Sequence, residues 1–124
     1  MQLRLTDREL DIMTVLWDRD SGTVAEVRAV LADPLAYTTV LSVLQTLEDK
    51  GFVGHVEEGK AHRYRPLVER GAAEKSAVNR LVSSLFEGSP ELLMTHLMTE
   101  QPLTPAEAKR LRMLLDDRLK GDSR

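Results

Sequence analysis

Three hydroxyl side chains stand together at the start of a segment that carries a regular apolar pattern. The stretch from Ala36 to Val53 reads AYTTVLSVLQTLEDKGFV, and Tyr37, Thr38 and Thr39 precede its apolar repeat. Hydroxyl groups both donate and accept hydrogen bonds, and threonine adds a methyl group for apolar contact. Threonine and valine are poor helix formers, so a segment shaped only for helical stability would not begin in this way. These side chains are therefore candidates for hydrogen bonding to a partner molecule.

Basic side chains form a second group with binding chemistry. The sequence KAHRYR holds Lys60, His62, Arg63 and Arg65, and it is the densest basic cluster in the chain. Cations in such a cluster can contact phosphate groups, because each neutralised phosphate releases condensed counterions. Taken alone, the cluster could be an ordinary solvated surface, and the hydroxyls could be a helix cap beside a partly buried Tyr37. The elements that hold both groups must therefore decide between these interpretations.

Histidines can also carry catalytic or metal-binding chemistry, and the chain has three: His55, His62 and His96. A two-residue turn at Glu58-Gly59 would place His55 and His62 opposite each other across a hairpin, whereas a three-residue loop with a bulge would not. No third ligand is evident, so these two are expected on the surface, and His96 on a surface or a dimer interface. With no catalytic triad in view, the sequence predicts no enzyme, no cofactor and no metal site.

Composition indicates a folded protein without cysteine chemistry. With 42% hydrophobic and 30% charged residues among 124, the chain can form one domain, or a small domain with an appendage. It contains no cysteine, which excludes disulfides, cysteine-based zinc sites and a thiol nucleophile. No apolar run approaches the length of a membrane span, so we expect a cytoplasmic protein that does not bind membranes directly.

The net charge of -3 argues mildly against a nucleic-acid partner. Domains that bind nucleic acids are usually basic, but acidic residues outnumber basic ones in residues 1–70 and balance them afterwards. Only local clustering, as in KAHRYR, could supply the positive charge that phosphates need.

Threonine and glutamate residues three positions apart indicate the starts of helices. In such a capping box each side chain hydrogen-bonds a backbone N–H that the helix end leaves free. A glycine after the last periodic residue ends a helix, and β-prone runs on both sides of Glu58-Gly59 indicate a hairpin. The first three predicted helices are about Asp7–Asp18 after Thr6, Val24–Ala32 after Thr23, and the segment from the Tyr37 region to Gly51; the predicted core residues of the first two are Leu10, Met13, Leu16, Trp17, Val27, Val30 and Leu31.

The last part of the chain contains no strand pattern and is expected to be helical. Its predicted helices are roughly Ala72–Phe86, Pro90–Met98 and Pro105–Leu119, the last one after a capping box of Thr104 and Glu107. About fifty residues can hardly bury enough surface alone. These helices therefore pack onto the N-terminal part or, as we prefer, pair with a second copy in a symmetric homodimer. The predicted dimerisation residues are Leu81, Leu85, Leu97, Leu111 and Leu115.

Three helices followed by a two-stranded hairpin are the order of a winged helix-turn-helix. There the third helix enters the DNA major groove, and the hairpin, or wing, lies along the phosphates; threonine can bond either base type and touch the thymine methyl group. The sequence thus predicts a mainly α fold with a small β-hairpin: a winged helix-turn-helix domain over residues 1–68 and an all-helical dimerisation region over residues 69–124. The predicted DNA-binding residues are Tyr37, Thr38, Thr39 and Ser42 on the helix and Lys60, His62, Arg63 and Arg65 on the wing.

The chain closely resembles the penicillinase repressor (BlaI/MecI-type) family over nearly its whole length, through LTDRELDIMTVLW, AYTTVLSVLQTLEDKGFV and EEGKAHRYRPLV. The resemblance implies a homodimeric winged-helix repressor that grips an inverted-repeat operator in double-stranded DNA. It also implies derepression by a protease coupled to a membrane sensor of β-lactams. Copper-responsive repressors of the same superfamily carry a C-terminal cysteine motif, which this chain lacks.

The family's cleavage position differs in this chain. Members regulated by proteolysis are cut at an Asn-Phe bond, and counting back from the LTPAE capping box aligns that bond with His96-Leu97. A different dipeptide implies a sensor of different specificity, a cut elsewhere, or another inducing signal.

Two rival functions fit the same fold. A small ligand could bind between the C-terminal helices, in a cavity lined by residues such as Leu85, Phe86, Met94 and Met98. Alternatively, the winged helix could be a protein-interaction module that never touches DNA, which the net acidity favours somewhat.

Overall fold

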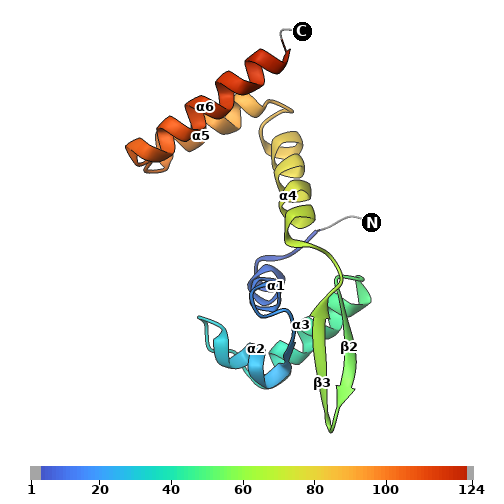
Figure 1. Ribbon diagram of the computed structural model, residues 1–124. Coiled ribbons are helices and arrows are strands. Elements are labelled where there is room, and N and C mark those ends of the chain that lie inside the picture. Colours follow the sequence, from blue (N-terminus) through green and yellow to red (C-terminus); the bar gives the residue numbers. More distant parts are fainter. Residues whose placement is uncertain (1–3, 123–124) are drawn as a thin grey trace. The chain divides into compact units, whose positions relative to one another are not determined.

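The computed structural model describes residues 4–122, which form six helices and a three-stranded antiparallel sheet (Figure 1). The predicted mainly α, winged helix-turn-helix fold is confirmed. Two compact units divide the chain, the N-terminal unit Met1–Arg80 and the C-terminal unit Leu81–Arg124. This division lies within α4, whereas the boundary expected from the sequence lay after Val68. The elements are α1 Asp7–Arg19, β1 Gly22–Thr23, α2 Val24–Val30, α3 Tyr37–Asp49, β2 Val53–Glu58, β3 Ala61–Pro66, α4 Arg70–Leu85, α5 Pro90–Glu100 and α6 Pro105–Asp122.

The start of α1 is held by the predicted capping box. The Thr6 hydroxyl accepts from the Glu9 N–H at 3.2 Å, and the Thr6 N–H donates to Glu9 Oε1 at 2.8 Å. Met13 and Leu16 are fully buried, as predicted. The prediction that Leu10 faces the core is wrong, because its side chain is 46% exposed. The buried stripe of α1 includes Glu9, and the next residue along a helix points to a neighbouring face.

A short strand that the sequence pattern did not reveal, β1, pairs with the outer side of β3 and completes the sheet. Two residues are too few for an alternating pattern to be recognised. Thr23 then caps α2 by accepting from the Glu26 N–H at 3.2 Å. The helix ends at Val30 instead of Ala32, because Leu31 takes an extended conformation with ψ 137°. Val30 was expected in the core, but in this last turn it is 50% exposed.

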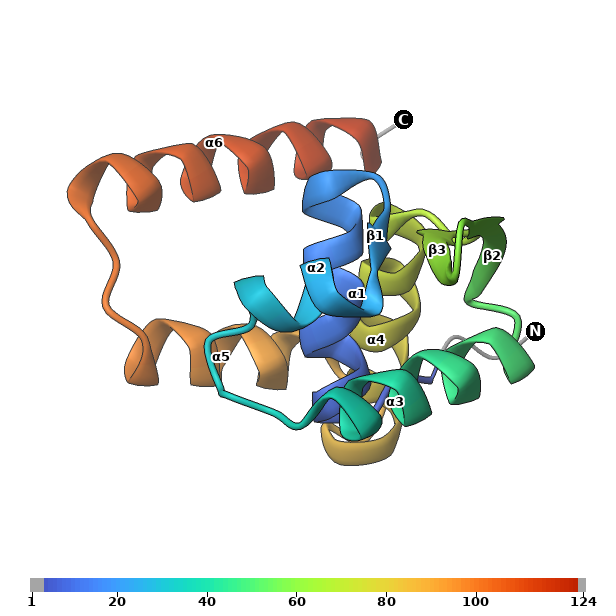
Figure 2. The ribbon, with the colours of Figure 1, turned by 90° about the horizontal axis from the view of Figure 1, so that it is seen from below.

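One face of α3 packs on the core, where Val40, Leu44 and Leu47 are fully buried. Figure 2 shows α3 beside α1 and α2, with the hairpin following its C-terminal end. Gly51, predicted to end the helix, has a positive φ of 85°. This left-handed conformation is the one that glycine supplies after a helix terminus.

The wing is the hairpin of β2 and β3, and its turn differs from the prediction by one residue. Glu58 pairs with Ala61, so the two turn residues are Gly59 and Lys60 rather than Glu58 and Gly59. Gly59 has φ 62°, which fits a two-residue turn with glycine at its first central position. His55 and His62 are therefore not opposite each other, as a turn at Glu58-Gly59 would have placed them, since His55 lies opposite Tyr64.

The C-terminal unit has no buried side chain among its described residues. The capping box before α6 is present, with hydrogen bonds of 3.1 Å in both directions between Thr104 and Glu107. Large apolar side chains nevertheless remain open to solvent in the single chain, up to 68% for Leu85. In the described residues, no helix is both long and apolar enough to span a bilayer.

Candidate nucleic-acid interface

The first turn of α3 exposes the hydroxyl groups that the sequence singled out. Tyr37 is 47% exposed, and Thr38, Thr39 and Ser42 are also exposed. The N-cap is Ala36, and no side-chain hydrogen bond caps the helix. The threonines are therefore not helix caps, and both residues are exposed to solvent. No acidic residue lies in this first turn, so nothing there repels a phosphate.

Gln45 belongs to the same surface, although the sequence analysis did not select it. It is exposed and lies three positions after Ser42 and seven after Thr38, a spacing that keeps all three on one helix face. A glutamine amide can form a paired contact with adenine in the major groove. The polar side of the apolar repeat includes Gln45, but this residue lies about two turns beyond the hydroxyl-rich start of the helix on which the prediction rests.

The cations of the wing fall into two groups. Lys60, in the turn, and Arg65, on β3, are exposed, and within the described part of the chain neither forms an ion pair. Arg63, by contrast, donates to both carboxylate oxygens of Glu26 at 3.0 and 2.9 Å and to Glu58 Oε2 at 3.0 Å. These hydrogen bonds raise the pKa of Arg63 above its ordinary value and lower the pKa of Glu26. Arg63 therefore ties the wing to α2, and its donors are largely occupied.

His55 ties the other face of the wing to α3. Its Nδ1 lies 2.7 and 2.8 Å from the two carboxylate oxygens of Glu48. The ring of His62 stacks on that of His55 at 4.2 Å, with an angle of 9° between the planes. Tyr64 beside them is buried, and this burial raises the pKa of its phenol. Among the residues described, no group of three potential ligands could hold a metal ion.

Lys50 fixes the C-terminal end of α3 against α1. Its Nζ lies 2.8 Å from each carboxylate oxygen of Glu9, whose side chain is buried. Burial alone raises the pKa of Glu9, but hydrogen bonds from Lys50 and Thr6 outweigh it and leave the pKa below its ordinary value of 4.5. Lys50, at the end of the segment, thus holds the C-terminal end of α3 in place through a buried partner.

The residues predicted for dimerisation and cleavage lie in the C-terminal unit. Exposed fractions are 40% for Leu81, 68% for Leu85, 48% for Leu97, 43% for Leu111 and 53% for Leu115. The His96-Leu97 bond is in the interior of α5, and the ring of His96 lies 5.4 Å from that of Phe86.

Comparison with known proteins gives a family and a set of relatives. Residues 5–117 match the family described as Penicillinase repressor. Transcriptional regulator BlaI of Mycobacterium tuberculosis (strain ATCC 25618 / H37Rv) is 34% identical over 111 residues, which cover 86% of this chain and 80% of that protein. Penicillinase repressor of Bacillus licheniformis is 22% identical over 116 residues, which cover 92% and 91% of the two chains.

Two solved structures are similar to this chain, one over about half of its length and the other over most of it. The solution structure of the DNA binding domain of the repressor BlaI has a TM-score of 0.52 and 28% identity, covering 56% of this chain and 88% of that one. A mutant of MarR from E. coli, complexed with operator DNA, has a TM-score of 0.55 and 19% identity, covering 94% and 77%. At that identity, the likeness to MarR shows the fold alone.

Proposed function

This chain belongs to the penicillinase repressor family and is a transcriptional repressor with a DNA-binding winged-helix domain; we propose that it binds an inverted-repeat operator as a homodimer. The observation that carries the proposal is the exposed, uncapped first turn of α3, which has hydroxyl groups and no carboxylate. A helix that enters the major groove needs short polar side chains of this kind at its N-terminal end.

In this proposal α3 contacts the base edges, whereas the wing and Tyr37 contact the phosphates. Thr38, Thr39, Ser42 and Gln45 present hydroxyl and amide groups to base edges. A phenol at a helix start can reach the backbone, and phosphate contacts set register without reading sequence. On the wing, Lys60, His62 and Arg65 are the exposed side chains available for phosphates, while Arg63 contributes mainly by holding the wing in place.

Dimerisation falls to the C-terminal unit. Leu81, Leu85, Leu97, Leu111 and Leu115 are exposed in the single chain, and this unit has no core of its own among its described residues. A second copy would remove these side chains from water, at about 25 cal/mol for each Å² of apolar surface buried. Two-fold symmetry would then present one α3 to each half of a palindromic operator.

Release from the operator would require this unit to come apart. The family resemblance suggests a protease coupled to a membrane sensor as a further partner, with His96-Leu97 as the aligned bond. A cut there would separate Leu97, Leu111 and Leu115 of the proposed interface from the DNA-binding domain. The His96-Leu97 dipeptide differs from Asn-Phe, and it lies inside α5. Both features indicate that a protease would have to recognise this bond differently from an Asn-Phe bond.

The test is an electrophoretic mobility shift of DNA from the chain's own promoter, with a scrambled duplex of equal length as the control. We expect a specific shift at a stoichiometry of two chains per palindrome. A folded protein that shifts neither duplex would overturn the proposal in favour of a protein-interaction module. Loss of the shift with a small molecule that also raises the melting temperature would support the ligand-controlled alternative.

A further inference from the structure

Several arginines of the N-terminal unit are neutralised within the fold. The unit has more acidic than basic residues. An arginine paired with a carboxylate adds little net attraction for a phosphate, because the carboxylate offsets its charge, so the cations without acidic partners matter most. The pairs are Arg8 with Asp11 and Asp33, Arg19 and Arg63 with Glu26, Arg63 also with Glu58, and Arg70 with Asp18.

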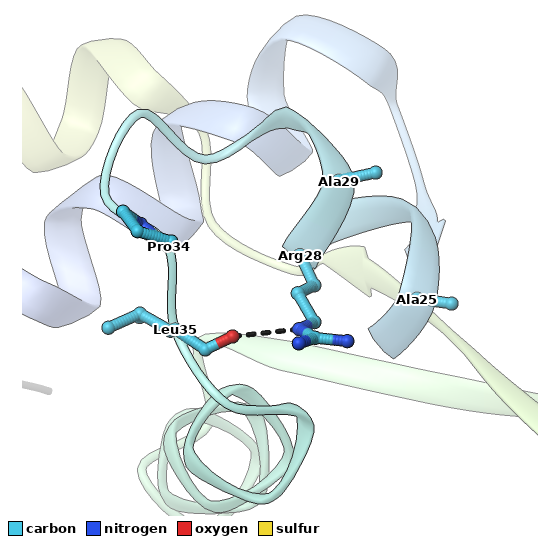
Figure 3. A pocket seen from close by; sticks show the side chains of 5 residues that line it. All are labelled: Ala25, Arg28, Ala29, Pro34 and Leu35. Atoms are coloured by element: carbon cyan, nitrogen blue, oxygen red, sulfur yellow. Dashed lines mark hydrogen bonds between the residues drawn. The ribbon is translucent and has the colours of Figure 1, made fainter.

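Arg28 differs from these arginines, because it forms no ion pair with any residue that the structure describes. It is exposed on α2, and its Nε donates to the carbonyl oxygen of Leu35 at 2.7 Å (Figure 3). An arginine carries five N–H donors in a planar fork. The bond to Leu35 uses one donor and leaves the Nη groups, with the full charge, for another partner.

The surroundings of Arg28 leave space for the sugar-phosphate backbone of DNA to come close. The guanidinium borders a shallow hollow of about 260 Å³ lined by Ala25, Ala29, Pro34 and Leu35 (Figure 3). Two alanines leave room there, where longer side chains would block access. Leu35 directly precedes Ala36, the N-cap of α3. The hydrogen bond from Arg28 to Leu35, called the tether below, therefore holds the cation beside the end of the helix that is proposed to enter the groove.

We propose that Arg28 is a DNA-contacting residue that binds a backbone phosphate beside the N-terminal end of α3. The wing supplies cations after the C-terminal end of the same helix, so contacts on both sides would fix its position along the groove. The planar guanidinium group can donate to two phosphate oxygens at once. Because the Leu35 carbonyl already orients the Arg28 side chain, binding a phosphate costs less side-chain entropy. This inference rests on the proposed function and adds a contact that the sequence pattern did not indicate.

Two substitutions separate charge from tether. Arg28→Gln removes the charge but keeps an amide that can donate to the Leu35 carbonyl; Arg28→Lys keeps the charge but loses the planar fork. Arg8→Gln is the matched control, because Arg8 also contacts the α2–α3 connection, at Asp33 with 3.3 Å, but is neutralised there. Binding isotherms of the full chain with promoter DNA and a scrambled duplex are recorded at several salt concentrations, after circular dichroism has checked each fold.

Arg28→Gln should weaken binding to both duplexes alike and reduce the salt slope by about one unit per contact, or about two in a dimer. Arg28→Lys should keep most of the slope, and Arg8→Gln all of it. An unchanged slope in a folded Arg28→Gln variant, with or without a loss of affinity, would overturn the inference and leave Arg28 as a structural tether. Failure of the wild-type chain to bind either duplex would instead remove the proposed function itself.

Discussion

At the scale of single residues, the interface combines side chains that read sequence with side chains that supply affinity. Thr38 and Ser42 carry short hydroxyls on an exposed helix face, whereas Lys60 is an exposed cation at a turn. Hydrogen bonds to base edges depend on sequence, and phosphate contacts depend mainly on salt. The two kinds of residue should therefore fail in measurably different ways.

Thr38→Ala or Ser42→Ala should cost about 1–3 kcal/mol per half-site on the cognate operator, with much less loss on random DNA and a nearly unchanged salt slope. Lys60→Ala should weaken binding to both DNAs and flatten the slope by about one unit per contact. Isotherms with operator and scrambled duplex at several salt concentrations measure both quantities. Equal losses on the two duplexes for the threonine variant would mean that Thr38 does not read bases.

The Glu9 carboxylate makes the free energy of unfolding decrease at acid pH. Its folded pKa is below the ordinary 4.5, so its contribution is fully present above about pH 4.5 and is lost as the pH falls through the folded pKa. Glu9→Gln should lower the free energy of unfolding at neutral pH, on the order of 1 kcal/mol, and make its decline below pH 4.5 shallower. Urea unfolding followed by the fluorescence of Trp17, the only tryptophan, measures this.

Glu107→Gln is the control for that experiment. The pKa of Glu107 is also lowered, by hydrogen bonds within its capping box, but it is exposed and no salt bridge is formed with it among the described residues. Its substitution should change the acid profile less. An identical profile in wild type and Glu9→Gln would show that the contact with Lys50 contributes nothing to acid sensitivity.

At the scale of elements, local chemistry was readable from the sequence, and contacts between distant segments were not. The capping boxes at Thr6 and Thr104 and the left-handed Gly51 were predicted because each depends on neighbouring residues alone. The strand β1 and the pairing of Arg63 with Glu26 depend on residues about forty positions apart. Arg63 therefore looked like a free wing cation in the sequence, although the fold engages it.

The turn of the wing shows how one residue changes a site. The dipeptides Glu58-Gly59 and Gly59-Lys60 both suit a tight turn, and the choice between them moves every cross-strand pair. In the actual register His55 and His62 are diagonal neighbours that stack, and Lys60 is placed at the tip. The tip position makes Lys60 the wing residue best placed for a phosphate.

The helix α5 bears on the predicted cleavage site. A protease needs an extended segment, so a bond in the interior of a helix is cut only after local unfolding. We expect an Asn-Phe-specific protease to leave His96-Leu97 intact, and the double variant His96→Asn, Leu97→Phe to be cut faster. Mass spectrometry of the chain after exposure to the protease measures both; a wild-type fragment ending at His96 would contradict the expectation.

At the scale of the whole molecule, the two units differ in how they can be stable. The N-terminal unit has a core of fully buried side chains such as Ile12, Leu44 and Phe52, which the C-terminal unit lacks in its described residues. A fragment ending at Arg80 should therefore be folded but monomeric in analytical ultracentrifugation, and should bind operator much more weakly than the full chain. It keeps the start of α4, where Ala73 is buried. If this fragment sediments as a dimer, the interface lies in the N-terminal unit.

Single substitutions on α6 test the same interface in the full chain. Leu111 and Leu115 are one helical turn apart and lie on one face, so a second copy that covers one should cover both. Leu111→Glu or Leu115→Glu should dissociate the dimer or unfold the C-terminal unit, because an unpaired charge in an apolar contact is costly.

Met113→Glu is the matched control for these substitutions. Met113 is an exposed apolar residue of the same helix, but at about 100° per residue it points to nearly the opposite side from Leu111. The control should stay dimeric and keep its affinity for operator, whereas the leucine variants should sediment as monomers and lose affinity through the missing second half-site. Unchanged sedimentation of both leucine variants would place the dimer contact on other elements. Dissociation of the Met113 variant as well would mean that α6 is enclosed on both sides, as in a bundle of helices from two copies.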